Sequence, residues 1–508
     1  MKKFFLYGLM MVLIISGISC TKYLTKEIQG VYPADQFYQT SDQAVVAINA
    51  AYQTLNFTSA TQNPLWVFGD VASDDAVKGG LAGDESDIGL IDVFNITPIN
   101  SNLSAEWGTL YEGVTRCNLV LAYVPAISMD TSLRSRILGE ARFLRAWYYF
   151  TLINIFGDVP IVLTPLTPSQ LQIAQSPAKE IYESVIEPDL KYAMTILPAV
   201  YNGSNSTTNA TNIGRVTSGA ATALLAKVYL FQQKWDSAMV AAQQVINSSL
   251  YSLMPVYSQN FSADYKNNAE SIFEVQMLSK QVPKTGNALN QWFAPAVDNG
   301  YFFNAPTQSF VSEFEVTAAG VADPRLNYTV GIDSMSWYNG ETFSASWSPT
   351  GYLTRKYQQP FSEIPISLKG DGSCDYLAIR YADVLLMYAE ALNASGNPSA
   401  ALVPLNEVRT RARDSYLYDT TLVGYDGTVP VGLLPDVTYT NQPDVLSAIQ
   451  HERRVEFGFE FHRYFDVIRW GKTYATQAMS NSPGFNYDLN KTFPIPQSER
   501  DTDKALLP

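Results

Sequence analysis

Apolar residues recur every three or four positions along residues 379–413, and this spacing predicts two helices joined by a short turn. Gly396-Asn397-Pro398 interrupts the pattern, and Pro398 suits the first turn of a second helix. Small residues on both helices would let the two backbones approach closely. They are Ala389, Ala391, Ala400 and Ala401.

The same periodicity predicts three further helical pairs earlier in the chain. The first should begin with a cap at Ser41 or Asp42, and Pro188 should kink one helix of the second. A hairpin with this spacing resembles a tetratricopeptide unit, which needs stacked copies to bury its apolar face. The sequence therefore predicts a mostly α fold with four tetratricopeptide-like helical pairs. The three earlier pairs are 41–55 with 106–127, 136–156 with 178–198, and 217–233 with 235–247.

Two stretches interrupt the helical periodicity. Residues 250–375 are rich in Gly, Pro, Asn, Ser and aromatic residues, and only 270–277 alternates like a strand. A second irregular stretch, 418–444, precedes a charged and aromatic segment, 445–472, which we interpret as one last helix. The chain closes on a Pro-rich segment. We expect an irregular, loop-rich subdomain with short strands beside the helices.

The N-terminus has the layout of a secretory signal. Lys2 and Lys3 precede an apolar run over residues 4–15, which is too short to span a bilayer permanently. Ser19 followed by Cys20 resembles a bacterial lipobox, although Gly17 stands where leucine is usual. We predict lipid attachment at Cys20, and ordinary signal cleavage is the alternative.

Composition agrees with an exported body that is large enough for a sizeable core. The 508 residues are 46% apolar. Without Lys2 and Lys3, 32 basic residues face 48 acidic ones, a net charge of about −16, which argues against nucleic-acid partners. Beyond Cys20 only Cys117 and Cys374 remain, and their pairing cannot be read from the sequence.

Several long motifs, in order, resemble the SusD/RagB family of Bacteroidetes outer-membrane lipoproteins. They are GEARFLRAWYYFTLINIFGDVP (139–160), GRVTSGAATALLAKVYLF (214–231), GYLTRKY (351–357), RYADVLLMYAEALN (380–393), ERRVEFGFEFHRYFDVIRWG (452–471) and FPIPQSE (493–499). The resemblance implies a non-catalytic, lipid-anchored protein at the outer membrane. Its partners would be a nutrient ligand and a SusC-like TonB-dependent transporter.

The predicted organisation follows from these elements. We expect a signal peptide at 1–19, a tether at 20–40 and an N-terminal helical region at 41–249. An irregular ligand-binding insertion should occupy 250–375. Residues 376–508 should hold the last hairpin, the charged helix and the Pro-rich tail.

Enzymatic readings find weak support in the motifs. His451-Glu452 begins like a zinc-protease motif but lacks its second histidine. Three short motifs of penicillin-binding proteins occur in order, but patterns this short arise by chance. Asp74 and Asp75 could suggest glycoside hydrolysis, yet adjacent carboxylates more often solvate a loop or bind a cation. The sequence does not decide whether that loop binds a structural calcium ion. No other metal or cofactor is predicted.

The charged residues of 452–469 are interpreted as a structural ion-pair network that holds the last helix to its neighbours, and not as a catalytic cluster. Ligand recognition is expected where the scaffold is irregular. Four tryptophans are expected on helices and in the core: Trp107, Trp147, Trp235 and Trp470.

The other four tryptophans fall in the irregular stretches and could stack on a sugar ring. Asp74, Asp75 and Lys78 are the predicted polar partners, because sugar hydroxyls need such groups. We predict a glycan-binding lipoprotein, with a peptide-binding RagB-like member as the alternative. The sequence does not name the glycan. The four candidate platforms are Trp66, Trp292, Trp337 and Trp347.

Overall fold

Paired helices form most of the computed structural model, which describes residues 34–205 and 207–506. The predictions for Cys20, the signal peptide and most of the tether lie outside these residues. The scaffold helices are α4 (Ser41–Gln53), α6 (Ser101–Tyr123), α7 (Thr131–Phe156), α8 (Ala178–Ile181), α9 (Glu187–Ile196), α10 (Ser218–Phe231), α11 (Trp235–Asn247), α15 (Tyr381–Ala394), α16 (Pro398–Tyr418) and α17 (Gln442–Glu456).

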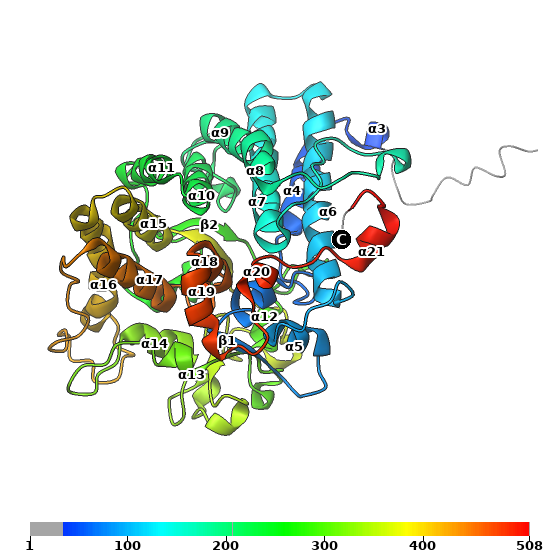
Figure 1. Cartoon of the computed structure of the whole chain (residues 1–508). Helices are drawn as coiled ribbons and strands as arrows, with labels where there is room; N and C mark the ends of the chain where they lie inside the picture. Colours follow the sequence, from blue (N-terminus) through cyan, green and yellow to red (C-terminus); the bar gives the residue numbers. More distant parts are fainter. Residues whose placement is uncertain (1–33, 206, 507–508) are drawn as a thin grey trace, which may run out of the picture.

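Apart from the short α8, each of these helices packs against the next one along the array. Helix α4 contacts α6, α6 contacts α7, and the order continues through α9, α10, α11, α15 and α16 to α17. In Figure 1 the array runs across the top and down the left of the view. The mostly α fold and its four helical pairs are therefore confirmed.

The helix starts follow local capping chemistry. Thr40 caps α4, with its hydroxyl accepting from the Gln43 backbone N–H, so the predicted cap at Ser41 or Asp42 was one or two residues late. Pro188 lies at the start of α9, directly after a single π-helical stretch at Tyr182–Ile186. The structure thus has a change of helix type just before Pro188, and the predicted kink stays a prediction.

The predicted last helix is not continuous. Helix α17 ends at Glu456, and the chain turns before α18 (Arg463–Arg469) and α19 (Lys472–Ala478). Phe459 and Phe461 have φ of 62° and 66°, which a helix cannot contain. A Cβ on Gly458 would lie 2.2 Å from the Phe310 ring, so this turn is pressed against a residue far away in the sequence.

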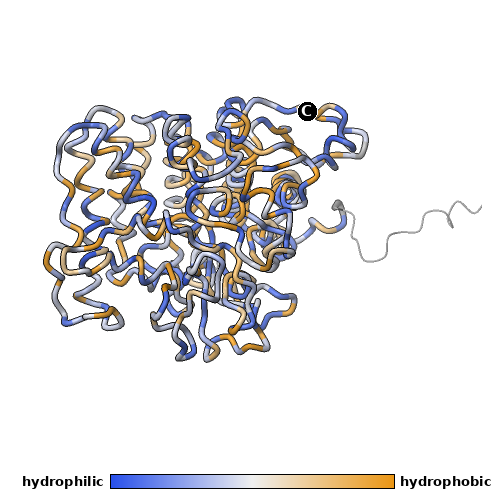
Figure 2. Tube along the Cα trace, turned by 60° about the horizontal axis from the view of Figure 1, so that its bottom comes forward, coloured by the Kyte–Doolittle hydropathy of each residue, from blue (hydrophilic) through white to orange (hydrophobic). Residues whose placement is uncertain are grey.

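The remaining elements are short, and many of them, among them α13, α14 and β1, gather at the bottom of Figure 1, whereas β2 lies at the centre and α3 and α21 at the right. They form three two-stranded antiparallel sheets, β1 with β3, β2 with β6, and β4 with β5. Orange, hydrophobic positions run through this end as well as through the helices (Figure 2). The strands are β1 (Ala76–Gly79), β2 (Ser271–Val275), β3 (Phe303–Pro306), β4 (Val330–Gly331), β5 (Leu353–Thr354) and β6 (Tyr376–Arg380). The short helices are α3 (Ala34–Phe37), α5 (Ser86–Asp92), α12 (Leu289–Trp292), α13 (Gln308–Val311), α14 (Pro324–Thr329), α20 (Tyr487–Asn490) and α21 (Gln497–Thr502).

The close contact predicted in the hairpin of α15 and α16 is present. Ala389, Ala391 and Ala401 are all fully buried. Replacing Ala389 with leucine should overpack this contact and lower the free energy of unfolding by about 1–3 kcal/mol. Denaturant unfolding would measure the loss. Val403→Leu on the exposed face of α16 is the control, and equal stability of the two variants would contradict the prediction.

Candidate functional site

The four loop tryptophans come together at the loop-rich end, around the ribbon of β1 and β3. The Trp66 and Trp292 ring centroids are 6.1 Å apart, and those of Trp337 and Trp347 are 6.5 Å apart. The buried carboxylate of Asp298, six residues after Trp292, accepts from the Trp337 indole N–H at 3.0 Å and so joins the two pairs.

Two of the four cannot act as ligand platforms, which corrects the prediction for Trp66 and Trp337. Trp66 is 0% exposed, and its indole N–H donates to the Ala60 carbonyl at 3.0 Å. Trp337 is 4% exposed and packs against Phe343. Their loops fold back to form core, so an indole in an irregular segment is not necessarily an exposed one.

Trp292 and Trp347 keep part of their surface exposed. Trp292 packs between Phe303 and Tyr301, with ring centroids 5.0 Å and 5.8 Å away, and Tyr301 is itself 43% exposed. The Trp347 ring packs against the Phe343 ring, with centroids 5.2 Å apart. Sequence reasoning missed Tyr301; its signal was an aromatic residue directly after the Asn299-Gly300 turn.

The predicted polar partners are already engaged with other protein groups. Asp74 binds Arg463 through both oxygens, at 2.8 and 2.9 Å, and Asp75 binds Arg454 at 2.7 Å. Burial raises the pKa of Asp74, but Arg463 and Arg454 outweigh it and hold the pKa below its usual value. Burial raises the pKa of Asp75 to about 6 against the pull of the same arginines.

Lys78 holds its own loop in place. Its ammonium donates to the backbone carbonyls of Leu81 and Asp84, at 2.8 and 2.7 Å, and lies 5.4 Å from the Phe303 ring centroid. Asp74, Asp75 and Lys78 therefore shape the loop beside the platform instead of reaching outward. Among the described residues, no group of three or more His, Cys, Asp or Glu side chains could hold a metal ion.

The charged residues of α17 form a buried network, as predicted. Glu456, fully buried, accepts from Arg325 at 2.9 Å and Arg380 at 2.5 Å, and also from Arg411. Arg380 and Arg411 in turn both bind Glu270, at 2.7 and 2.6 Å. Burial would raise the pKa of Glu456, but the three arginines hold it well below its usual range. The network joins the irregular insertion to the scaffold.

Other reactive side chains are committed to packing or pairing. His451 Nδ1 lies 2.7 Å from Glu313, and His462 Nδ1 lies 3.2 Å from the ammonium of Lys227, so the two histidines face different partners. Cys117 and Cys374 are free and buried, and burial raises the pKa of the Cys374 thiol to about 12. No helix in the described part of the chain is long and apolar enough to cross a membrane.

Stacked helical pairs that carry a loop-rich, aromatic end define a tetratricopeptide-like scaffold protein. Two family models match this chain: the SusD family over residues 269–507, and a family described as starch-binding and associating with the outer membrane over residues 33–230. The chain belongs to the SusD/RagB family.

Individual relatives are similar over nearly the whole length. SusD-like protein P38 of Formosa agariphila is 26% identical, covering 96% of this chain and 95% of the relative. A solved laminarin-binding SusD-like protein is 27% identical with a TM-score of 0.74, covering 92% of this chain and 99% of that one. A SusD-like carbohydrate-binding protein from Bacteroides fragilis, 24% identical over 93% of this chain and 100% of its own, shares the fold with a TM-score of 0.77.

Proposed function

We propose that this chain is a non-catalytic glycan-binding protein of the cell surface. It captures an oligosaccharide on the loop-rich end, where Tyr301 is exposed and Trp292 and Trp347 are partly exposed, and hands it to a TonB-dependent transporter of the outer membrane. A solved relative is named for laminarin binding, and one matching family model is described as starch-binding.

The observation that carries the proposal is how the Trp292 ring is packed. Its ring is partly exposed while the rings behind it, Trp66 and Phe303, are fully buried or nearly so. A platform held in this way loses little conformational freedom when a sugar ring stacks on it. The Lys78 contacts fix the adjacent loop, so the face is preorganised.

Trp292→Ala should weaken oligosaccharide binding about thirtyfold, because loss of a central aromatic anchor typically costs ~2 kcal/mol or more. Isothermal titration calorimetry against a glycan panel that includes laminarin would measure the change. Trp235→Ala, at the first residue of α11, is the matched control and should leave affinity intact. Unchanged affinity in Trp292→Ala would place the glycan elsewhere.

The same panel tests the alternative, a peptide-binding RagB-like member. A peptide ligand would rely on backbone pairing and side-chain pockets instead of flat rings. Binding of peptides but of no glycan, with Trp292→Ala without effect, would favour it. The absence of catalysis is checked at once by chromatography of the recovered glycan, which should be uncleaved.

The anchor is proposed to be a lipid on Cys20. Cys20→Ala should release an otherwise folded protein from the membrane fraction, since no other anchor is proposed. Cell fractionation in a strain without the partner transporter gives the readout. A Ser19→Ala variant, which keeps a small residue before the cysteine, should stay membrane-bound. Retention of Cys20→Ala in the outer membrane would contradict the proposal.

A further inference from the structure

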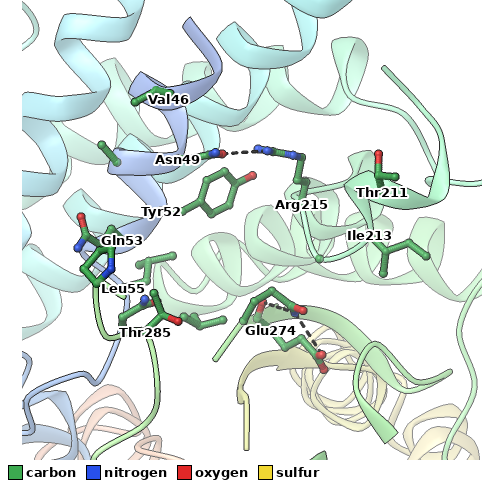
Figure 3. Close-up of a pocket in the computed structure, with 16 residues that line it drawn as sticks. Val46, Asn49, Tyr52, Gln53, Leu55, Thr211, Ile213, Arg215, Glu274 and Thr285 are labelled. Carbon is green, nitrogen blue, oxygen red and sulfur yellow. Dashed lines mark hydrogen bonds between the residues drawn. The ribbon is translucent and has the colours of Figure 1, made fainter. Parts of the chain in front are cut away.

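A pocket of about 500 Å³ opens on the scaffold between α4, residues 211–215 and the end of β2 (Figure 3). A second pocket of about 270 Å³ adjoins it and shares Ile213, Gly214, Arg215 and Glu274. Together they form the β2 groove. Every residue from 271 to 276 lines it. Side chains of a strand alternate between its two faces. Since residues of both faces line the groove, it runs along the length of the strand.

Aliphatic and polar side chains share the walls of the larger pocket, and the aliphatic ones are Val46, Ala50, Leu55, Ile213, Val275 and Pro283. Val46 and Ile213 stand at its mouth, 56% and 51% exposed, an unusual position for branched apolar side chains. Tyr52 is the one aromatic residue that lines the larger pocket. Flat aromatic surfaces suit sugar rings, whereas a hollow with branched aliphatic walls suits the aliphatic side chains of a polypeptide. The larger pocket therefore differs in chemistry from the tryptophan-bearing end, whereas Tyr201, Tyr251 and Phe273 line the smaller one.

Side-chain amides are interspersed among these aliphatic residues: Asn49, Gln53, Asn56 and Gln276. An amide offers donors and an acceptor in the geometry of a peptide group, so it can pair with an extended backbone. Some are already oriented. Asn49 accepts from Arg215 at 2.8 Å, one of the dashed lines of Figure 3, and Gln276 donates to Glu274 at 3.2 Å.

Two exposed lysines lie on the turn beside the groove. Leu278 and Thr285 close this turn by an antiparallel bridge, and Lys284 stands between Pro283 and Thr285, which line the larger pocket. Two carboxylates are also near: Glu274 lines the groove, and Asp371 accepts from the Lys280 backbone N–H at 2.7 Å. The two lysine side chains favour a ligand with negative charge at that end.

We propose that the β2 groove binds an extended segment of a partner protein. The segment has aliphatic side chains at alternate positions and acidic residues at the end that meets Lys280 and Lys284. Its length is about five residues, since it follows a strand of that length at ~3.3 Å per residue. None of Trp292, Tyr301 and Trp347 lines the groove, and this proposal does not rest on glycan binding.

Fluorescence anisotropy of labelled peptides with the full chain tests this. The probes are seven-residue peptides in which valine and threonine alternate and two glutamates occupy one end, together with counterparts that carry lysines there. We expect the acidic probes to bind more tightly. Ile213→Lys should weaken binding at least tenfold, and Val240→Lys, equally exposed on α11 but outside the groove, should not. Lys284→Glu should reverse the preference between acidic and basic probes.

Five outcomes would overturn the proposal. No probe binds; Ile213→Lys binds as wild type; Lys284→Glu leaves the charge preference unchanged; or an oligosaccharide displaces the probe, so that the groove takes sugar. Concentration-dependent self-association that Ile213→Lys abolishes would likewise assign the groove to a second copy of this chain. Loss of glycan binding in Trp292→Ala with peptide binding retained would show that the two sites are independent.

Discussion

Replacing Glu456 with glutamine should lower the free energy of unfolding by about 3–5 kcal/mol, because removal of one partner leaves other buried charges uncompensated. Arg325, Arg380 and Arg411 all donate to this carboxylate, and each is 6% exposed or less. The substitution keeps the shape of the side chain and removes only its charge. Urea unfolding followed by circular dichroism would give the difference.

The control for this measurement lies on α6. Glu112 pairs with Arg116 four residues later, at 2.5 Å, and the Glu112 side chain is 55% exposed. Glu112→Gln should therefore cost under about 1 kcal/mol, as surface pairs do. Equal losses for Glu112→Gln and Glu456→Gln would mean that the buried network contributes no more than a surface pair.

Replacing Glu106 with glutamine should stabilise the protein, and the gain should grow as the pH rises. Glu106 is 1% exposed on α6, and its Oε2 has no hydrogen-bond partner among the described residues. It lies beside a cavity of about 20 Å³ lined by Leu55, Tyr148 and Val275 among others. Burial raises the pKa of this carboxyl from 4.5 to about 8.

The sign of the effect follows from linkage. Below pH 4.5 the carboxyl is protonated in both the folded and the unfolded chain, and stability is unaffected. Between pH 4.5 and about 8 only the unfolded chain has released the proton, so folding loses stability progressively. The loss reaches on the order of 4 kcal/mol at pH 8.

Thermal unfolding of Glu106→Gln and wild type across pH 5–8 would measure this prediction. The difference in melting temperature should widen toward pH 8. Glu112→Gln, on the same helix but exposed, should show no such widening. A difference that stays constant with pH would mean that Glu106 is ionised in the folded protein.

The sequence predicted what depends on neighbours along the chain. Helical pairs, the strand at 270–277 and the contact of Ala389 with its neighbours follow from local periodicity, and the structure confirms them. The break after Glu456 did not follow, because it depends on how closely Gly458 approaches Phe310, about 150 residues earlier. Periodicity does not contain that information.

The candidate site was predicted less completely, for the same reason. Irregular segments were expected to expose their tryptophans, yet Trp66 is buried against Phe293, and the buried Trp337 donates to Asp298, both partners from other loops. Asp74 was read as a free carboxylate because Arg463, its partner, lies 389 positions away. The sequence indicated that the four loop tryptophans share one region, but it did not indicate which of their rings keep exposed surface.

The buried network also limits how this protein can open. Glu270 precedes β2, Arg325 belongs to α14, Arg380 ends β6, Arg411 lies on α16 and Glu456 ends α17. Separating any one of these segments would strip a buried charge of its counter-ion, a cost close to that of global unfolding. The insertion and the helical array are thus one cooperative unit, in which amide protons near these anchors exchange only when the whole molecule unfolds.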